Sequence, residues 1–254
     1  MILLRVLSAE LLKLRRTNAL RLVAIAPLSI VVLLTFFFTQ APTMIGRQRE
    51  DSWISLARII FVFWALLVLP LYIALQTALV AALEHAENQW KLILARPLPR
   101  WTVYVAKLFV VAGFTSVSGA LLLGGILVSG VILRSPRFEL HFGPIPYSLL
   151  VASTLRITFL ALLSLTIQHW VALRFRSFTV AVGTGIVAMM TGYGTTILAS
   201  RDLVVWTRYF PWTLPMMEWV RPPIDTTPLL WFSGIVGLVV ATAGCIDFSR
   251  RDVQ

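Results

Sequence analysis

The side chains best placed to do chemistry in this chain form one polar island, residues 84–107, between two long apolar runs. Its charged and aromatic members are Glu84, Glu87, Trp90, Lys91, Arg96 and Arg100. Glu87 and Lys91 are four residues apart, a spacing that suits a local helical ion pair and equally suits contact with a partner protein. Because an unpaired polar group costs several kcal/mol in lipid, we expect the island on the water side of a membrane.

Catalytic motifs are missing from the sequence. It contains no G-x-x-x-x-G-K-[ST] loop, so we expect no enzyme activity and no nucleotide hydrolysis by this chain alone. The three histidines, His85, His141 and His169, fall in different loops or span ends and lack the spacing of metal ligands. We therefore expect neither a metal nor a cofactor in this chain.

Composition places the chain among membrane proteins. Hydrophobic residues make up 58% of its 254 residues and charged residues 13%, against about 25% charged in soluble domains. The net charge of +11 arises from basic residues scattered singly at the ends of apolar runs, so no nucleic-acid partner is expected. The single cysteine, Cys245, excludes an internal disulfide.

Six transmembrane helices are predicted, because about 20 apolar residues cross a bilayer. Pro70 and Gln76 interrupt the second of these spans. The predicted fold is therefore all-α, a single transmembrane domain over residues 1–254, with both termini on one side. The expected spans are residues 19–38, 56–83, 108–133, 148–173, 178–199 and 229–246.

The N-terminal segment, residues 1–17, is predicted to be an amphipathic helix in the headgroup plane. Its leucines share one face: Leu3, Leu4, Leu7, Leu11 and Leu14. Of the 22 lysines and arginines, 13 fall on the side of the termini and the island and 8 on the other side. This bias predicts that both termini and the island are cytoplasmic.

Three features could belong to a transport path. Arg156, inside the fourth span, either lines a path or holds an anionic group, or it snorkels outward or pairs with a loop acid such as Glu139. Gln76 is expected either to bond a neighbouring helix or to contact a substrate. Residues 200–228 form an aromatic extracytoplasmic connection, either an ordinary interfacial belt or a gate-like lid. Its gate candidates are Tyr209, Phe210 and Trp212.

The order of these motifs resembles that of a known family. An amphipathic start over residues 8–17 precedes the first span. The island then reads Glu84-x-x-Glu87-x-x-Trp90-Lys91, followed by Arg96-Pro97-Leu98-Pro99-Arg100 and by Ala106-Lys107. With six expected spans and a charged C-terminus, the chain resembles the permease subunit of the type-2 ABC (ATP-binding-cassette) exporter family. In style it is similar to the short permeases of lantibiotic and bacteriocin self-protection systems.

The resemblance implies a bacterial inner-membrane permease that exports an amphipathic, lipophilic or peptide cargo. A separate partner ATPase would bind ATP and Mg and would dock on the island, with Arg174 and Arg176 contributing. A second permease copy or a homologous permease would complete a dimer. Two other classes stay open: a non-transporting six-span scaffold or assembly factor, and an ion-coupled transporter. An ion-coupled transporter would need acidic residues at mid-depth in its spans. The sequence places only Asp247 at an inner span boundary, and no span carries an acid at mid-depth.

Overall fold

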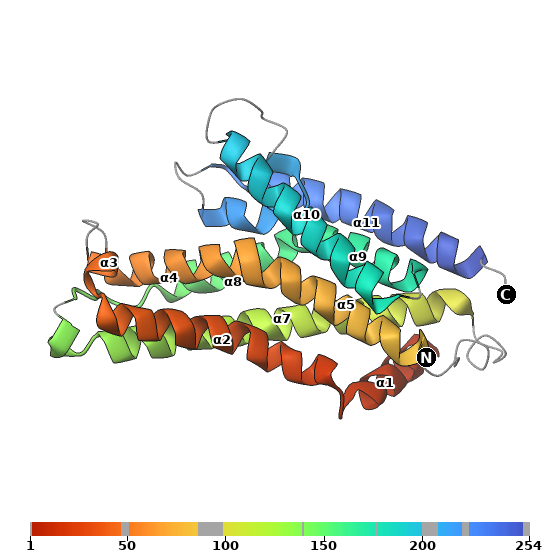
Figure 1. Cartoon of the computed structure of the whole chain (residues 1–254), viewed down its shortest axis with the longest axis horizontal. Coiled ribbons are helices and arrows are strands. Elements are labelled where there is room, and N and C mark those ends of the chain that lie inside the picture. Colours follow the sequence, from red (N-terminus) through yellow and green to blue (C-terminus); the bar gives the residue numbers. More distant parts are fainter. Residues whose placement is uncertain are drawn as a thin grey trace.

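A computed structural model describes residues 2–46, 51–85, 99–138, 140–175, 177–199, 208–219 and 224–250. Over these residues the chain is helical and contains no strand. The long helices run along one axis, and α1 lies at the same end of the bundle as the last turn of α11 (Figure 1). We call this end of the bundle the α1 end. The described helices are α1 (Ile2–Leu14), α2 (Asn18–Gln40), α3 (Thr43–Gly46), α4 (Ser52–Phe63), α5 (Leu69–His85), α7 (Arg100–Leu133), α8 (Tyr147–Leu160), α9 (Leu162–Arg174), α10 (Phe178–Ala199) and α11 (Thr227–Arg250). Three short helical turns join them: η1 (Trp64–Val68), η2 (Pro136–Phe138) and η4 (Leu214–Trp219).

Five helical segments in the described residues are long and apolar enough to cross a membrane: α2, Ser52–Leu83, α7, Tyr147–Arg174 and α11. They correspond to five of the expected spans, and they make the chain a multi-pass membrane protein. The remaining expected span is α10, whose apolar part over Phe178–Gly194 is shorter. A sixth crossing and the sidedness of the termini therefore stay predictions.

The second span continues through Pro70 where the sequence predicted an interruption. The five residues before Leu69, Trp64–Val68, form one π-helical turn, so α4, η1 and α5 follow one another without a loop. Proline has no N–H to donate and its ring crowds the carbonyl four residues earlier. A wider turn at this point accommodates both effects.

The fourth span contains a break at Ala161, where α8 ends and α9 begins. A side chain from α11 meets this break. The Ser233 hydroxyl lies 3.2 Å from the Phe159 carbonyl oxygen and 3.1 Å from that of Leu160, and it accepts a bond from the Leu163 N–H at 3.4 Å. Backbone groups freed by the break thus find partners inside the bundle, as burial requires.

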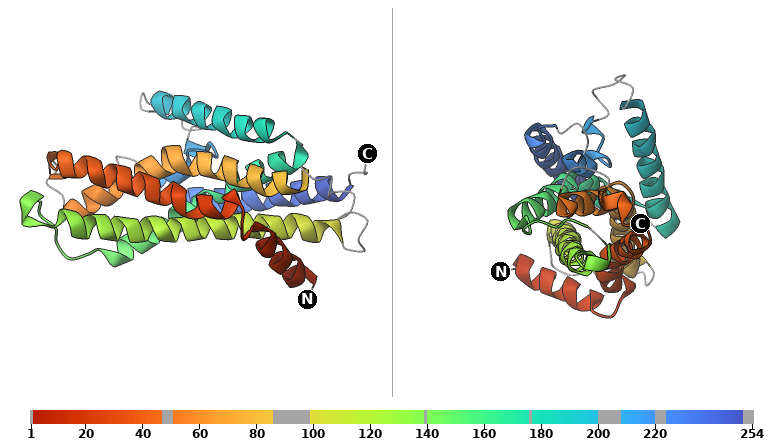
Figure 2. Two further views of the ribbon diagram at one scale, coloured as in Figure 1. Left: turned by 60° about the horizontal axis from the view of Figure 1, so that its bottom comes forward. Right: turned by 90° about the vertical axis from the view of Figure 1, so that its left-hand side faces the viewer.

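Small residues bring the helices close together. Gly125 of α7 lies against Val31 of α2, and the Ser118 hydroxyl donates to the Val23 carbonyl at 2.8 Å. Gly185 of α10 lies against Ala74 of α5. α10 packs on α5 and α9 and lies at the edge of the bundle (Figure 2).

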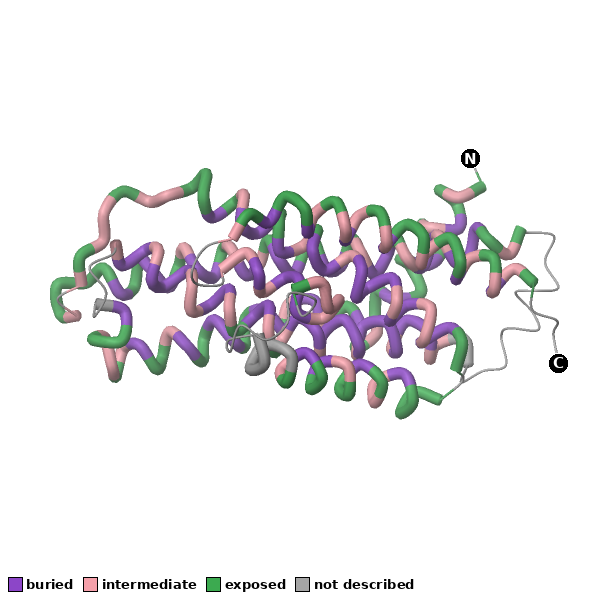
Figure 3. Tube along the Cα trace, turned by 90° about the horizontal axis from the view of Figure 1, so that it is seen from above, coloured by how far each residue is buried: buried purple, intermediate pink, exposed green. Residues whose placement is uncertain are grey.

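Burial follows the pattern of a protein that is solvated by lipid. Buried positions face the centre of the bundle, and exposed positions run in rows along the outer faces (Figure 3). Many of the exposed side chains are large and apolar, among them Phe36, Val187 and Leu238. Contiguous apolar surface of this kind is rare on soluble monomers and typical of contact with acyl chains.

Candidate functional site

The predicted coupling island begins in the last turn of α5 and ends in the first turns of α7, and these two turns lie at the α1 end (Figure 1). Residues 86–98 are outside the described residues, so the roles of Glu87, Trp90, Lys91 and Arg96 stay predictions. Arg176 and the side chain of Glu84 are also outside them. The described residues around the island can still show what a partner would act upon.

The N-terminal helix presents a different face to the bundle than its leucines suggested. Val6, Glu10 and Leu14, spaced four apart, are buried against α7 and its neighbours, whereas Leu4 and Leu11 are exposed. Leu4 and Leu11 are therefore available to lipid, as expected of an interfacial helix. The predicted leucine face is divided, because Leu14 is buried and Leu3 and Leu7 pack partly against the bundle. The face that packs on protein carries an acid, and this acid has a specific partner.

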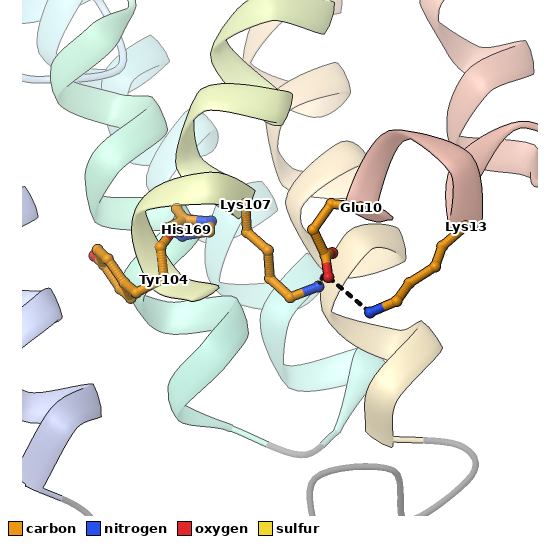
Figure 4. A network of polar contacts seen from close by, with 5 residues as sticks. All are labelled: Glu10, Lys13, Tyr104, Lys107 and His169. Carbon is orange, nitrogen blue, oxygen red and sulfur yellow. Dashed lines mark hydrogen bonds and ion pairs between the residues drawn. The ribbon is translucent and has the colours of Figure 1, made fainter. Parts of the chain in front are cut away.

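Glu10 forms a buried ion pair with Lys107. The Lys107 ammonium lies 2.6 Å from Glu10 Oε2, and the Lys13 ammonium lies 2.7 Å from Oε1 (Figure 4). The Lys107 side chain is 1% exposed and the Glu10 side chain 5%, whereas Lys13 is 39% exposed. Short contacts between charged groups in a buried setting are strong only while both partners are present. This pair therefore fastens α1 to α7.

Electrostatics at Glu10 favour the charged form. Burial alone would raise the pKa of the Glu10 carboxyl, but the charge of Lys107 and hydrogen bonds from Lys107 and Lys13 outweigh burial and hold the pKa below its ordinary value of 4.5. Opposite charges at hydrogen-bond distance act in this direction. The Glu10 carboxylate is therefore ionised at neutral pH.

An aromatic contact joins three helices beside the ion pair. Tyr104, three residues before Lys107 on α7, meets the His169 ring of α9 edge-on, with ring centroids 4.8 Å apart. Phe248 of α11 lies 5.9 Å from Tyr104 by the same measure. Gly244 lies against the Tyr104 ring and Trp170, and a side chain there would collide with them. α7, α9 and α11 are thus in close contact at the α1 end.

Two of the predicted coupling residues, Arg100 and Arg174, lie near the end of α11. The Arg174 guanidinium lies 3.3 Å from Asp247 Oδ1, and the Trp170 indole N–H donates to Asp247 Oδ2 at 3.0 Å. The Arg100 guanidinium reaches the Ser249 carbonyl at 3.5 Å. These contacts cross between helices far apart in sequence. The arrangement can transmit a displacement between these helices.

The second candidate region, the predicted gate-like connection, folds back onto the bundle through η4. Leu214, Pro215 and Met217 are buried, and η4 contacts α4, η1 and α8. The Trp219 ring stacks on Phe61 of α4, with centroids 5.7 Å apart and an interplanar angle of 20°. The connection therefore packs against the spans over its described part, residues 208–219.

The three predicted gate residues lie together just before η4. The Tyr209 ring meets Phe232 of α11 at 5.1 Å between centroids, and Phe210 lies 5.8 Å from Trp212. The indole N–H of Trp212 is buried and has no hydrogen-bond partner among the described residues. Such a group is costly to bury.

Arg156 pairs with an acid that the sequence did not suggest. Its guanidinium lies 3.4 Å from Glu218 Oε1, and Glu218 also accepts from Ser153 at 3.4 Å and from Thr226 at 3.1 Å. The Glu218 side chain is 7% exposed and that of Arg156 53%. Glu139, the partner considered from sequence, lies outside the described residues.

Gln76 lies apart from both groups. It is fully buried in α5, and neither amide atom has a hydrogen-bond partner among the described residues. No group of three or more His, Cys, Asp or Glu side chains that could hold a metal gathers in the part of the chain that the structure describes.

Sequence reasoning missed the roles of Glu10, Lys107 and Glu218. A signal existed for the first two: Glu10 is the only acid among the first 49 residues, and Lys107 stands at the start of an apolar run. An acid in a basic helix and a lysine at the start of a span are each expected to need a partner of opposite charge. Glu218 gave no such signal, because it falls in a connection between spans that holds several other charged residues.

Comparison with known proteins gives one match. A family model described as "ABC-2 family transporter protein" matches residues 6–192, which covers most of the chain, from α1 into α10. No curated protein matches the chain, and no solved structure does.

Proposed function

Because the chain belongs to the ABC-2 family of transporter proteins and is a multi-pass permease of an ABC exporter, we propose that it moves an amphipathic, lipophilic or peptide cargo outward with ATP hydrolysed by a separate partner subunit. The partner ATPase would dock on residues 84–100, with Arg174 and Arg176 beside them. The cargo class and the partner follow from the resemblance of the whole chain to such exporters.

The observation that carries the coupling proposal is the buried Glu10–Lys107 pair. It lies on the first turns of α7, immediately after the proposed docking segment, and fastens the interfacial helix to them. A push on the segment would therefore move α1 and the base of α7 together. With 34 residues, α7 is about 51 Å long at 1.5 Å per residue, so it can act as a lever across the bilayer.

The same push would reach α5 and α11. The docking segment follows α5 directly in the chain, and Arg100, at its end, contacts the Ser249 carbonyl of α11. At the far side of the path, the connection through η4 would act as the lid that opens for cargo. The half-exposed Arg156 in its 3.4 Å contact with Glu218 and the unpartnered Trp212 indole support this assignment, because an arginine that leaves this ion pair can reach water or a headgroup.

We further propose the bacterial cytoplasmic membrane as the location, with cytoplasmic termini, and a dimer of two permeases, identical or homologous, over two ATPases. Self-protection against lantibiotic-like peptides is the proposed physiological role. A peptide with apolar and basic faces would suit a path bounded by apolar helices and an aromatic lid.

The direct test is purification of the full chain from its native membrane. We expect a subunit with a P-loop to co-purify, a second permease copy in the complex, and ATP-dependent export of a labelled lantibiotic from cells. A complex without a nucleotide-hydrolysing subunit would contradict the proposal and favour the scaffold alternative. Export that follows an ion gradient without ATP would favour the ion-coupled alternative.

A charge reversal tests the docking site itself. Arg96→Glu should abolish co-purification of the ATPase, because reversing a charge at the contact both removes an attraction and adds a repulsion. The matched control is Arg137→Glu on η2, an exposed arginine outside the α1 end. Equal ATPase recovery with both variants would remove residues 84–100 as the docking segment.

A further inference from the structure

The bundle has an open groove on its outer surface, between α8 and α11. Its volume is about 610 Å³, within the range of about 300–1,000 Å³ of small-molecule sites. Apart from Arg156, Thr227 and Gly234, every residue that lines it is large and apolar: Leu155, Phe159, Leu230, Trp231, Ile235 and Leu238. Leu155, Trp231 and Leu238 are exposed, so the groove opens on a surface that faces lipid.

Polar groups occur at one end of this groove. Arg156 contributes a guanidinium whose side chain is half exposed, and a single nitrogen of it contacts Glu218. Asp225 is fully exposed and lies two residues before Thr227. It accepts the Thr227 backbone N–H at 2.9 Å. This hydrogen bond is the main reason that the pKa of Asp225 is lowered, and the charge of nearby Arg156 lowers it to a smaller extent. The end of the groove thus offers a cation with an exposed carboxylate close to it.

We propose that this groove binds a zwitterionic phospholipid of the surrounding bilayer, with one acyl chain along α8 and α11, the phosphate on Arg156 and a primary amine at Asp225. The apolar lining matches an acyl chain, whose burial is favourable for every methylene. The guanidinium matches a phosphate, to which it can donate two parallel bonds.

Charge complementarity selects the headgroup. The carboxylates of Glu218 and Asp225 near Arg156 disfavour a lipid that brings only negative charge. An ammonium on the same headgroup compensates them. A phosphatidylethanolamine therefore fits the rim better than a phosphatidylglycerol, although both offer the same chains and the same phosphate.

Bound lipid would also touch the lid. A phosphate on Arg156 shares the guanidinium with Glu218, and Glu218 is part of η4. A lipid in the groove would therefore change how firmly η4 is held against α8.

Binding of defined lipids to the delipidated full chain in detergent tests the site. Native mass spectrometry would follow titration with dioleoyl phosphatidylethanolamine and, in a second arm, dioleoyl phosphatidylglycerol. We expect one phosphatidylethanolamine to bind preferentially. Leu238→Trp, which fills the groove from an exposed position, should abolish that binding. The same change at the adjacent exposed residue, Val239→Trp, lies outside the groove lining and should leave it intact.

Two further variants test the rim. Arg156→Gln should weaken phosphatidylethanolamine about tenfold, the loss of one good charge-assisted contact, while Arg137→Gln on η2 should not. Asp225→Asn, at a fully exposed side chain, should leave binding of phosphatidylglycerol unchanged or stronger and remove the preference for phosphatidylethanolamine.

Equal binding by the Leu238→Trp and Val239→Trp variants would overturn the groove as the site. Equal affinity of the unmodified chain for the two lipids would overturn the headgroup assignment. The measurement needs neither ATP nor the partner subunit, so a negative result would leave the export proposal standing, and loss of the export proposal would leave this one.

Discussion

The α1 end and the region around η4 are both held by an acid and a base on different helices, yet the two ion pairs differ in kind. At the α1 end, Glu10 and Lys107 are 2.6 Å apart and both side chains are buried. Near η4, Glu218 and Arg156 are 3.4 Å apart, and the arginine is half exposed. The difference indicates which part of the molecule moves as a body and which part can open.

Burial makes the first pair hard to separate. Parting two buried charges leaves each without compensation in a medium of low dielectric, whereas a half-exposed arginine that leaves its partner finds water or a headgroup. The α1 end is therefore suited to passing on a displacement, and the η4 region is suited to changing shape. Single substitutions at the two ion pairs test this contrast.

Lys107→Met should have the largest effect, because Glu10 would stay buried without its principal partner. We expect the free energy of unfolding to fall by about 3 kcal/mol, the scale for breaking one half of a buried ion pair. Thermal unfolding of the full chain in detergent measures it. The double variant Glu10→Met with Lys107→Met should recover much of the loss, since neither charge is then buried alone.

A loss that is the same in the single and double variants would show that Lys107 acts through its stem rather than its charge. The charges of Glu10 and Lys107 would then not be what fastens α1 to α7, and packing alone would have to explain the contrast between the two regions.

Glu218→Gln should have a smaller effect. Arg156 is half exposed and can turn to solvent. Ser153 and Thr226 contact different oxygens of Glu218, so one hydroxyl can still donate to the amide oxygen and the other can accept from the amide N–H. We expect a loss of about 1 kcal/mol, the scale of one hydrogen bond. The same unfolding assay measures it. A loss as large as that of Lys107→Met would contradict the distinction between a firm end and a loosely held lid.

The pH dependence of stability should report Glu10 specifically. Its pKa is lowered in the folded state, so its stabilising contribution is complete above the ordinary value of 4.5 and is lost as pH falls through the folded pKa. The melting temperatures of the unmodified chain and of Glu10→Gln should differ at neutral pH and converge well below 4.5. A difference that does not change with pH would mean that Glu10 is not ionised in the fold.

Lys13→Met should have the smallest effect. The Lys13 side chain is 39% exposed and contacts Glu10 from three residues along the same helix, and such pairs contribute about 0.5 kcal/mol or less. It serves as the matched control for Lys107→Met, because both remove a lysine from the same carboxylate. Equal losses would show that burial does not set the strength of the contact.

Hydrophobic patterning was sufficient to predict the class of fold and five spans. Apolar runs of this length are stable in a bilayer only as helices that cross it. The ends of α2 and α11 and the C-terminal end of α7 therefore fall within a few residues of their expected places, whereas α7 begins earlier than expected, at Arg100. Patterning could not predict the continuity of the second span at Pro70, because that depends on a π-helical turn that no residue type marks.

The polar contacts between helices could not be read from the sequence. Glu10 and Lys107 are 97 residues apart and Glu218 and Arg156 are 62 apart. Their meeting depends on which helices are neighbours, which composition does not fix. The Ser233 contact with the break at Ala161 is of the same kind. The sequence predicted Arg156 as a polar residue in need of a partner, and only the packing of η4 supplies the partner.

The central claim is that α1 and the base of α7 move as one body when the partner ATPase works. Spin labels on Leu12→Cys of α1 and Phe109→Cys of α7, both exposed positions, in a Cys245→Ala background, would report their separation by pulsed electron paramagnetic resonance in the complex. We expect the same distribution of distances between the two labels in the nucleotide-free and the vanadate-trapped states. A distribution that shifts or broadens on trapping would contradict it.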